Sequence, residues 1–131
     1  MDKAANKKYE GTFMDFEIKD GILIATYKED TFIDKAAAVI SVKERLEFSE
    51  YKDMPALVIA TNVKVVTKEA RNYFGSPEGS SLLKASGIYS NSVLATYIAN
   101  FLISVNLHKS IVPVKLFLNK EKAIEWLKEY R

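Results

Sequence analysis

The sequence contains no cysteine and a single histidine, His108. Without cysteine the chain has no disulfide, no thiol nucleophile and no thiolate metal site, and one histidine excludes a histidine-rich metal centre. The Gly-x-Ser-x-Gly, His-Glu-x-x-His and Gly-x-Gly-x-x-Gly motifs are also missing. No pattern places a nucleophile or an orienting acid beside His108, which we expect near a helix end. We therefore expect no catalytic residue, no metal, no cofactor and no enzymatic activity.

An excess of charge of one sign is missing as well. The 19 basic and 17 acidic residues leave a net charge of +2 over 131 residues, and no basic cluster has interleaved aromatic residues. This argues against a nucleic-acid partner. The N-terminus, Met1–Asn6, has no apolar segment of the signal-peptide type. The most apolar segment, Val93–Leu107, is too short for an easy membrane span. We expect a cytoplasmic protein without a membrane span.

The composition is that of one globular domain. The chain is 48% apolar and 27% charged, which is enough for a real core at this length. The first residues are polar and include Lys3, Lys7 and Lys8, so we expect a flexible N-terminal tail over residues 1–11. The domain then covers residues 12–131.

The chain alternates between strand and helix signals. Residues 12–19 alternate between apolar and polar side chains, Asp20-Gly21 is a strong hairpin signal, and Ile22–Tyr27 returns as a second strand. Further strands are predicted at 56–60, 86–89 and 114–118, and helices at 35–48, 67–74, 76–84, 92–107 and 120–130. The pattern predicts an α/β fold with a five-stranded mixed, mainly parallel sheet, in which the first strand is antiparallel.

Caps and stripes locate the first and the last helix. Asp34 is placed to cap the helix over residues 35–48, and Asn119 to cap the C-terminal helix. In the first of these helices the predicted apolar stripe consists of Ala36, Val39, Ile40 and Leu46. Its last turn is predicted to be solvated and contains Lys43, Glu44, Arg45 and Glu47. In the C-terminal helix we expect Trp126 and Leu127 to face the core.

This order of elements resembles the STAS fold of anti-sigma-factor antagonists and the related lipid-binding SEC14 class. The resemblance covers residues 12–131 and is closest to small uncharacterised bacterial SpoIIAA-like proteins. Three segments carry it: Asp20–Ile22 at the hairpin, Thr67–Phe74 at the second long helix, and Leu116–Leu127 at the C-terminus. The resemblance implies the fold, and none of the three segments is a catalytic motif.

The resemblance also defines a phosphoacceptor slot, in which typical STAS regulators carry an Asp-Ser-Ser motif. Here the slot holds Thr67, Lys68 and Glu69. Lys68 falls where the phosphorylated serine would be, and a lysine cannot accept phosphate from a serine kinase. The hydroxyl of Thr67 is placed to cap the helix that follows. We expect Thr67 to be structural and unphosphorylated.

The helix predicted over Val93–Leu107 carries apolar residues on more faces than one sheet can cover. Its uncovered side is a candidate interface or the wall of an apolar pocket, and the residues singled out there are Tyr97, Phe101, Leu102 and Val105. Three alternatives could cover this side: the neighbouring helices, a second subunit or an apolar ligand. A homodimer through this helix or through the adjacent Gly75–Leu83 segment is the first expectation.

Two functions from different classes follow. The first is a non-enzymatic regulatory or protein-interaction module of STAS-like type that lacks the phosphoacceptor serine. The alternative, implied by the resemblance to the SEC14 class, is a carrier or sensor of an apolar small molecule or lipid. Its pocket would lie between the helices at 67–84, the Val93–Leu107 helix and the sheet.

Overall fold

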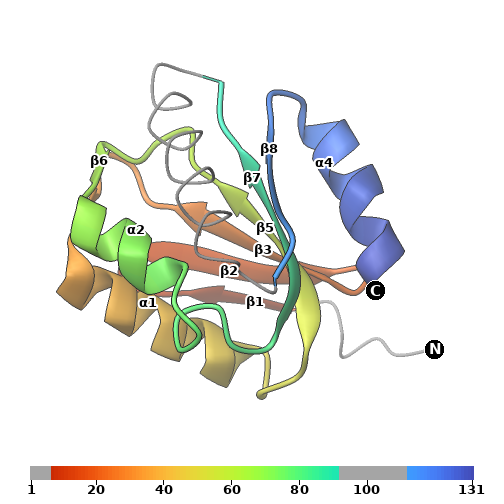
Figure 1. Cartoon of the computed structure of the whole chain (residues 1–131), viewed down its shortest axis with the longest axis horizontal. Coiled ribbons are helices and arrows are strands. Elements are labelled where there is room, and N and C mark those ends of the chain that lie inside the picture. The colour runs from red at the N-terminus through yellow and green to blue at the C-terminus, as the bar shows by residue number, and fades with distance from the viewer. Residues whose placement is uncertain (1–6, 92–111) are drawn as a thin grey trace.

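The computed structural model in Figure 1 shows a twisted sheet with helices on both faces. The structure describes residues 7–91 and 112–131. Helices α1 (Lys35–Phe48) and α2 (Lys68–Phe74) lie on one face of the sheet, and α4 (Lys120–Leu127) lies on the other.

The main sheet has six strands in the order β1-β2-β3-β5-β7-β8. Their bounds are β1 Lys7–Glu10, β2 Met14–Lys19, β3 Ile22–Tyr27, β5 Met54–Ile59, β7 Leu83–Tyr89 and β8 Val114–Phe117. Strands β2 and β3 pair antiparallel, and β3, β5, β7 and β8 run parallel. The predicted mixed, mainly parallel sheet is confirmed, but the predicted number of five strands is wrong.

The additional strand, β1, lies in the segment that the sequence assigns to a flexible tail. Residues Lys7–Glu10 pair antiparallel with β2 at the edge of the sheet. The strand is mostly exposed, so it has no alternating apolar pattern that the sequence could reveal. Backbone pairing holds it, together with the Tyr9 ring, which stacks on Phe16 and Phe48. The flexible-tail prediction is therefore wrong for residues 7–10.

The hairpin between β2 and β3 forms as predicted. Asp20 and Gly21 have φ angles of 55° and 79°, as a tight turn with two left-handed residues requires. A second, two-stranded parallel sheet was not predicted. It joins β4 (Phe32–Ile33) to β6 (Val65–Val66).

Helix α1 has the predicted bounds, but it buries a different face. The Asp34 carboxylate accepts a hydrogen bond of 2.8 Å from the backbone N–H of Ala37, which confirms the predicted cap. The buried residues are Ala37, Ala38, Ser41, Val42 and Arg45. Val39 and Ile40, from the predicted stripe, remain 39% and 40% exposed. Small side chains on this face allow α1 to approach the sheet and α2 closely, and this packing overrides the larger residues of the predicted stripe.

The predicted helix at 76–84 does not form. Residues 75–82 make turns, and β7 already begins at Leu83. The Ser76 hydroxyl accepts a hydrogen bond of 3.0 Å from the backbone N–H of Gly79 and donates one to the Tyr73 carbonyl. Such side-chain bonds compete with those of a helix. Gly79 also packs so closely on the Tyr73 carbonyl that a Cβ atom would clash there.

Helix α4 confirms its prediction. The Asn119 side-chain oxygen accepts a hydrogen bond of 3.0 Å from the backbone N–H of Lys122. Leu127 is fully buried against the sheet, and the Trp126 ring contacts the rings of Phe117 and Tyr130. Lys122, Glu125 and Lys128, on the other side of the helix, are exposed. The helix ends in a 3-10 turn over Lys128–Tyr130.

Candidate functional site

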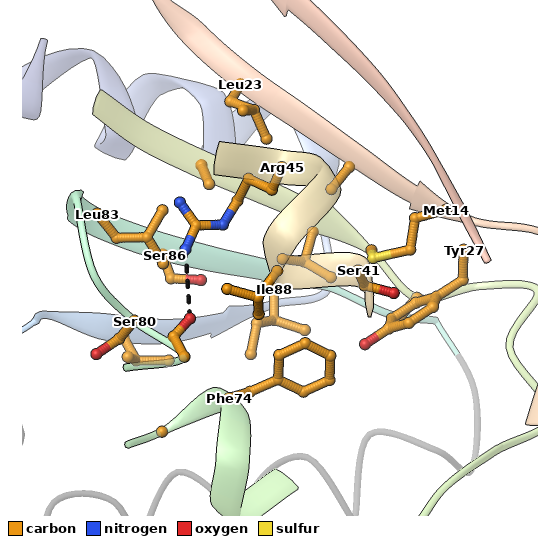
Figure 2. Close-up of a pocket in the computed structure, with 18 of the residues that line it drawn as sticks. Met14, Leu23, Tyr27, Ser41, Arg45, Phe74, Ser80, Leu83, Ser86 and Ile88 are labelled. Carbon is orange, nitrogen blue, oxygen red and sulfur yellow. Dashed lines mark hydrogen bonds between the residues drawn. The ribbon is translucent and has the colours of Figure 1, made fainter. Parts of the chain in front are cut away.

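An apolar pocket lies between the sheet and helices α1 and α2 (Figure 2). Its cavity volume is about 130 Å³. Strand residues that point away from α4 form its floor. The lining residues from the strands include Met14, Phe16, Leu23, Ala25, Tyr27, Ala56, Val58, Leu83, Ser86, Ile88 and Val114; those from the helices and loops include Ser41, Val42, Arg45, Ala60, Val66, Arg71, Phe74, Gly75, Gly79, Ser80 and Val112.

Small residues on opposing walls leave this space open. The central strands of the floor contribute two small side chains, Ala25 on β3 and Ala56 on β5. A third, Ala60, directly follows β5. Ser41 faces the pocket from α1. Protein interiors are usually close-packed, with few voids larger than a water molecule. A cavity of this size in the described part of the chain is therefore unusual, and it is a candidate binding site for a ligand.

One charged side chain is buried at the pocket. Arg45, in the last turn of α1, is only 7% exposed. Its Nη2 donates hydrogen bonds to the backbone carbonyls of Gly79 at 3.3 Å and Ser81 at 3.0 Å. Both carbonyls belong to the turn before β7, so Arg45 ties α1 to that turn. Burial lowers the pKa of the Arg45 guanidinium to about 10, and the nearby Tyr73 opposes this shift.

No carboxylate compensates this charge among the described residues. In residues 7–91 and 112–131 the ion pairs join Lys7 to Glu50 and Lys28 to Asp15, and Arg45 takes part in neither. The described lining holds a second arginine, Arg71, and no acidic residue. Arg71 is partly buried, and its Nη1 donates a hydrogen bond of 2.7 Å to the Val66 carbonyl. The pocket is thus apolar with a positive pole.

The opposite side of the pocket carries a phenol. Figure 2 shows the Tyr27 ring on the far side from Arg45, with Ile88 and Phe74 between them in this view. Tyr27 is 6% exposed, and burial raises the pKa of its hydroxyl, so this group is neutral at physiological pH. Ser41 lies near it, but its hydroxyl already donates a hydrogen bond of 2.8 Å to the Ala37 carbonyl.

The predicted phosphoacceptor slot lies at the start of α2. The Thr67 hydroxyl accepts a hydrogen bond of 3.1 Å from the backbone N–H of Ala70, so the predicted N-cap is present. The Thr67 backbone N–H donates to the Ile33 carbonyl at 2.9 Å. Lys68 and Glu69 are exposed. The absence of phosphate on Thr67 stays a prediction.

The other predicted site residues, Tyr97, Phe101, Leu102 and Val105, lie outside the described residues, and so does His108. Gly75, Gly79 and Ser80, from the segment predicted to be helical at 67–84, line the cavity together with the sheet.

Sequence reasoning missed the central role of α1 and of Arg45, which it placed on a solvated surface. A signal was available in the spacing of Ala37, Ser41 and Arg45, which recur every four residues on one side of α1. That row of small residues ending in an arginine marks a face that permits close approach. If hydrophobicity is the only criterion, the face with Val39 and Ile40 is the better candidate for burial than the face with Ala37, Ser41 and Arg45.

The sheet order and the placement of the helices define a SpoIIAA-like α/β fold. A similar solved structure is the crystal structure of an uncharacterized protein from the DUF3478 family with a SpoIIAA-like fold, from Shewanella loihica PV-4. The two are 16% identical and superpose with a TM-score of 0.56, covering 87% of this chain and 91% of that chain. At this identity the likeness shows the fold alone.

The chain belongs to the family described as "Domain of unknown function (DUF7793)", which matches residues 16–131. The comparison with curated proteins found no match. The resemblance to an uncharacterised SpoIIAA-like family is therefore confirmed. Within residues 7–91 and 112–131, no helix combines the length and the apolar content needed to cross a bilayer.

Proposed function

We propose that this domain binds a small apolar molecule in the pocket between the sheet, α1 and α2, and acts as its carrier or sensor without chemically changing it. The observation that carries this proposal is the cavity of about 130 Å³ with its mainly apolar lining. Of the two functions that the sequence leaves open, this is the one that uses the apolar cavity.

The size of the cavity sets the size of the ligand. An engineered apolar cavity of about 150 Å³ in another protein stays dry and binds benzene. A void of about 130 Å³ therefore accommodates a ligand of roughly six to ten heavy atoms, and not a lipid with two acyl chains. Each methylene group that leaves water on binding contributes about 0.8 kcal/mol. Such a ligand thus gains most of its affinity from burial.

The test combines identification with a binding measurement. Organic extraction of protein purified from its native cell, followed by mass spectrometry, is expected to reveal a small apolar compound in stoichiometric amount. In parallel, 1-octanol should raise the melting temperature, because a ligand that binds only the folded state stabilises it. The control is Ala25→Leu, which fills the centre of the pocket floor and should abolish the shift. Absence of both the compound and the shift would reject the proposal.

The second candidate is the regulatory or protein-interaction module, and a specific observation favours it. Phe32 is 57% exposed and Val65 is 38% exposed, and the two are paired between β4 and β6. They lie beside the Thr67 cap, whose backbone binds the carbonyl of the adjoining Ile33. Two exposed apolar side chains at the slot where STAS-like proteins are regulated support contact with another protein.

The homodimer expected from the sequence is the simplest form of this second candidate. Light scattering at high protein concentration should give a dimer mass for the parent chain. The double variant Phe32→Ser, Val65→Ser should give a monomer mass if this surface forms the interface. A monomer mass for the parent would reject the dimer. A dimer unaffected by the double variant would place the interface elsewhere.

A further inference from the structure

Arg45 has hydrogen-bonding capacity that the described residues do not use. A guanidinium group has five N–H donors. Within residues 7–91 and 112–131, both hydrogen bonds of Arg45 leave from Nη2, towards the carbonyls of Gly79 and Ser81. The donors on Nε and Nη1 have no acceptor among these residues. The residue is nonetheless 93% buried, because its exposed fraction is 7%.

Among residues 7–91 and 112–131, no carboxylate forms an ion pair with Arg45. Its two acceptors are neutral carbonyls, and the described pocket lining contains no carboxylate. An arginine keeps its proton at physiological pH even in such a place. A buried charge without a counterion is unfavourable, whereas a buried charge that meets an anion gains charge-assisted hydrogen bonds. An anion in this pocket would therefore be held at Arg45.

The rest of the pocket decides what kind of anion fits. Most of the lining is apolar, with Leu83, Ile88 and Phe74 among the labelled side chains in Figure 2, and the serines Ser80 and Ser86 lie on the Arg45 side. A small inorganic anion would leave most of a cavity of about 130 Å³ empty, since one water molecule occupies about 30 Å³ in the liquid. A dianionic phosphate group would also exceed the single charge of Arg45, while Arg71, the other arginine of the lining, already donates to the Val66 carbonyl. A monoanionic head on an apolar body fits both the charge and the volume.

We propose that the ligand of this domain is a small apolar carboxylic acid, whose carboxylate binds Arg45 and whose hydrocarbon part fills the pocket between the sheet, α1 and α2. This inference rests on the proposed function, since it names the chemical class of the ligand in the same pocket. Arg45 then has two roles on different atoms. Nη2 holds the turn before β7, and the remaining donors bind the acid.

The experiment compares two probes that differ only in the head group, sodium octanoate and 1-octanol, by titration calorimetry on the full chain. Octanoate is expected to bind about tenfold or more tightly, because hydrogen bonds to a charged group contribute about 1.5–3 kcal/mol. In the Arg45→Met variant the preference for octanoate over octanol should fall below about twofold, because the hydrogen bonds to the guanidinium are lost. The control Lys43→Met removes an exposed cation from the same helix and should keep the full preference.

A second measurement covers the case in which Arg45→Met fails to fold. In ¹⁵N-labelled parent protein, the Nε–H signal of Arg45 should shift on addition of octanoate and remain in place with octanol. Equal binding of the two probes would overturn the carboxylate inference and leave the proposed function standing. Binding of neither probe would overturn both. A preference for octanoate that persists in Arg45→Met, or an unmoved Nε–H signal, would show that Arg45 does not bind the acid.

Discussion

The two faces of the sheet are built from the same strands but packed in different ways. On the α4 face the buried core consists of Ile22, Leu57, Ala85, Ala123 and Leu127. Leu127 reaches so far into this layer that its side chain lies against Gly87 of β7, where a Cβ atom would be only 3.3 Å from Leu127 Cδ1. This face is filled.

On the α1 and α2 face, the fully buried residues of the core cluster that come from the helices are all alanines, namely Ala37, Ala38 and Ala70. Two strand residues on this face, Ala25 and Ala56, are small as well. The cavity and Arg45 occupy the space that remains. Successive residues of one strand therefore point to different faces: in β5, Leu57 packs under α4 and Val58 lines the pocket. The α4 face is thus close-packed, whereas the α1 and α2 face combines the larger buried core with a cavity.

Removing α4 tests the filled face most severely. Truncation after Asn119 deletes Ala123 and Leu127 and exposes Ile22 and Leu57, which are 2% and 0% exposed in the intact chain. We expect the truncated chain to lose cooperative unfolding, because the layer that covers one whole side of the central strands is gone. Circular dichroism during heating measures this. A cooperative transition at the parent's temperature would contradict the described role of α4.

A matched pair of leucine truncations compares the faces directly. Leu127→Ala should lower the free energy of unfolding by about 3 kcal/mol, since it opens a cavity in a close-packed layer. Leu83→Ala, at the pocket wall, should cost only about 1 kcal/mol, since this partly buried side chain already borders a void. Urea denaturation of both variants gives the difference. Equal costs would mean that the two faces are packed alike.

Adding atoms should show the same order, with the α4 face less tolerant than the pocket face. Gly87→Ala should lower the free energy of unfolding by about 1 kcal/mol, because the new methyl group presses on Leu127. Ala25→Val, on the pocket side, should change it by less than about 0.5 kcal/mol, since the added methyl groups enter open space. The same variant should weaken octanol binding in the calorimeter. A large loss of stability for Ala25→Val would indicate that the pocket is already filled in solution.

A further pair of modest effects concerns the helix caps on the two faces. Thr67→Ala removes the cap of α2 and should cost about 1 kcal/mol, and Asn119→Ala should cost a similar amount at α4. Chemical denaturation measures both. Intact-mass spectrometry of protein from its native cell should show no phosphate on Thr67. Stoichiometric phosphate there would instead make the slot a regulatory one.

Local signals in the sequence predicted much of the fold. The Asp20-Gly21 turn, the caps at Asp34, Thr67 and Asn119, and the alternation of strands with helices each depend on neighbouring residues, and each is found as predicted. Such features are decided within a few residues of the chain, so a single sequence contains them.

The candidate site was hidden because it depends on packing between segments that are distant in the sequence. Arg45 lies among charged neighbours typical of an exposed helix turn, yet it is buried and donates hydrogen bonds to the turn at Gly79 and Ser81, 34 and 36 residues away. The misassigned helix at 76–84 had the same cause, since serine hydroxyls and the close approach of Gly79 to Tyr73 replaced helical bonding.

By itself, then, the sequence determined the hairpin, the capped helix starts and the mixed, mainly parallel sheet. Periodicity and turn chemistry depend on neighbouring residues, and therefore they can be predicted without a structure. Tertiary structure alone decided that Lys7–Glu10 completes the sheet, that α1 buries its small residues, and that an arginine stands in an apolar pocket. Those outcomes depend on which surfaces approach closely enough to exclude water, and a local pattern such as the row of small residues on α1 permits that approach without specifying its partner.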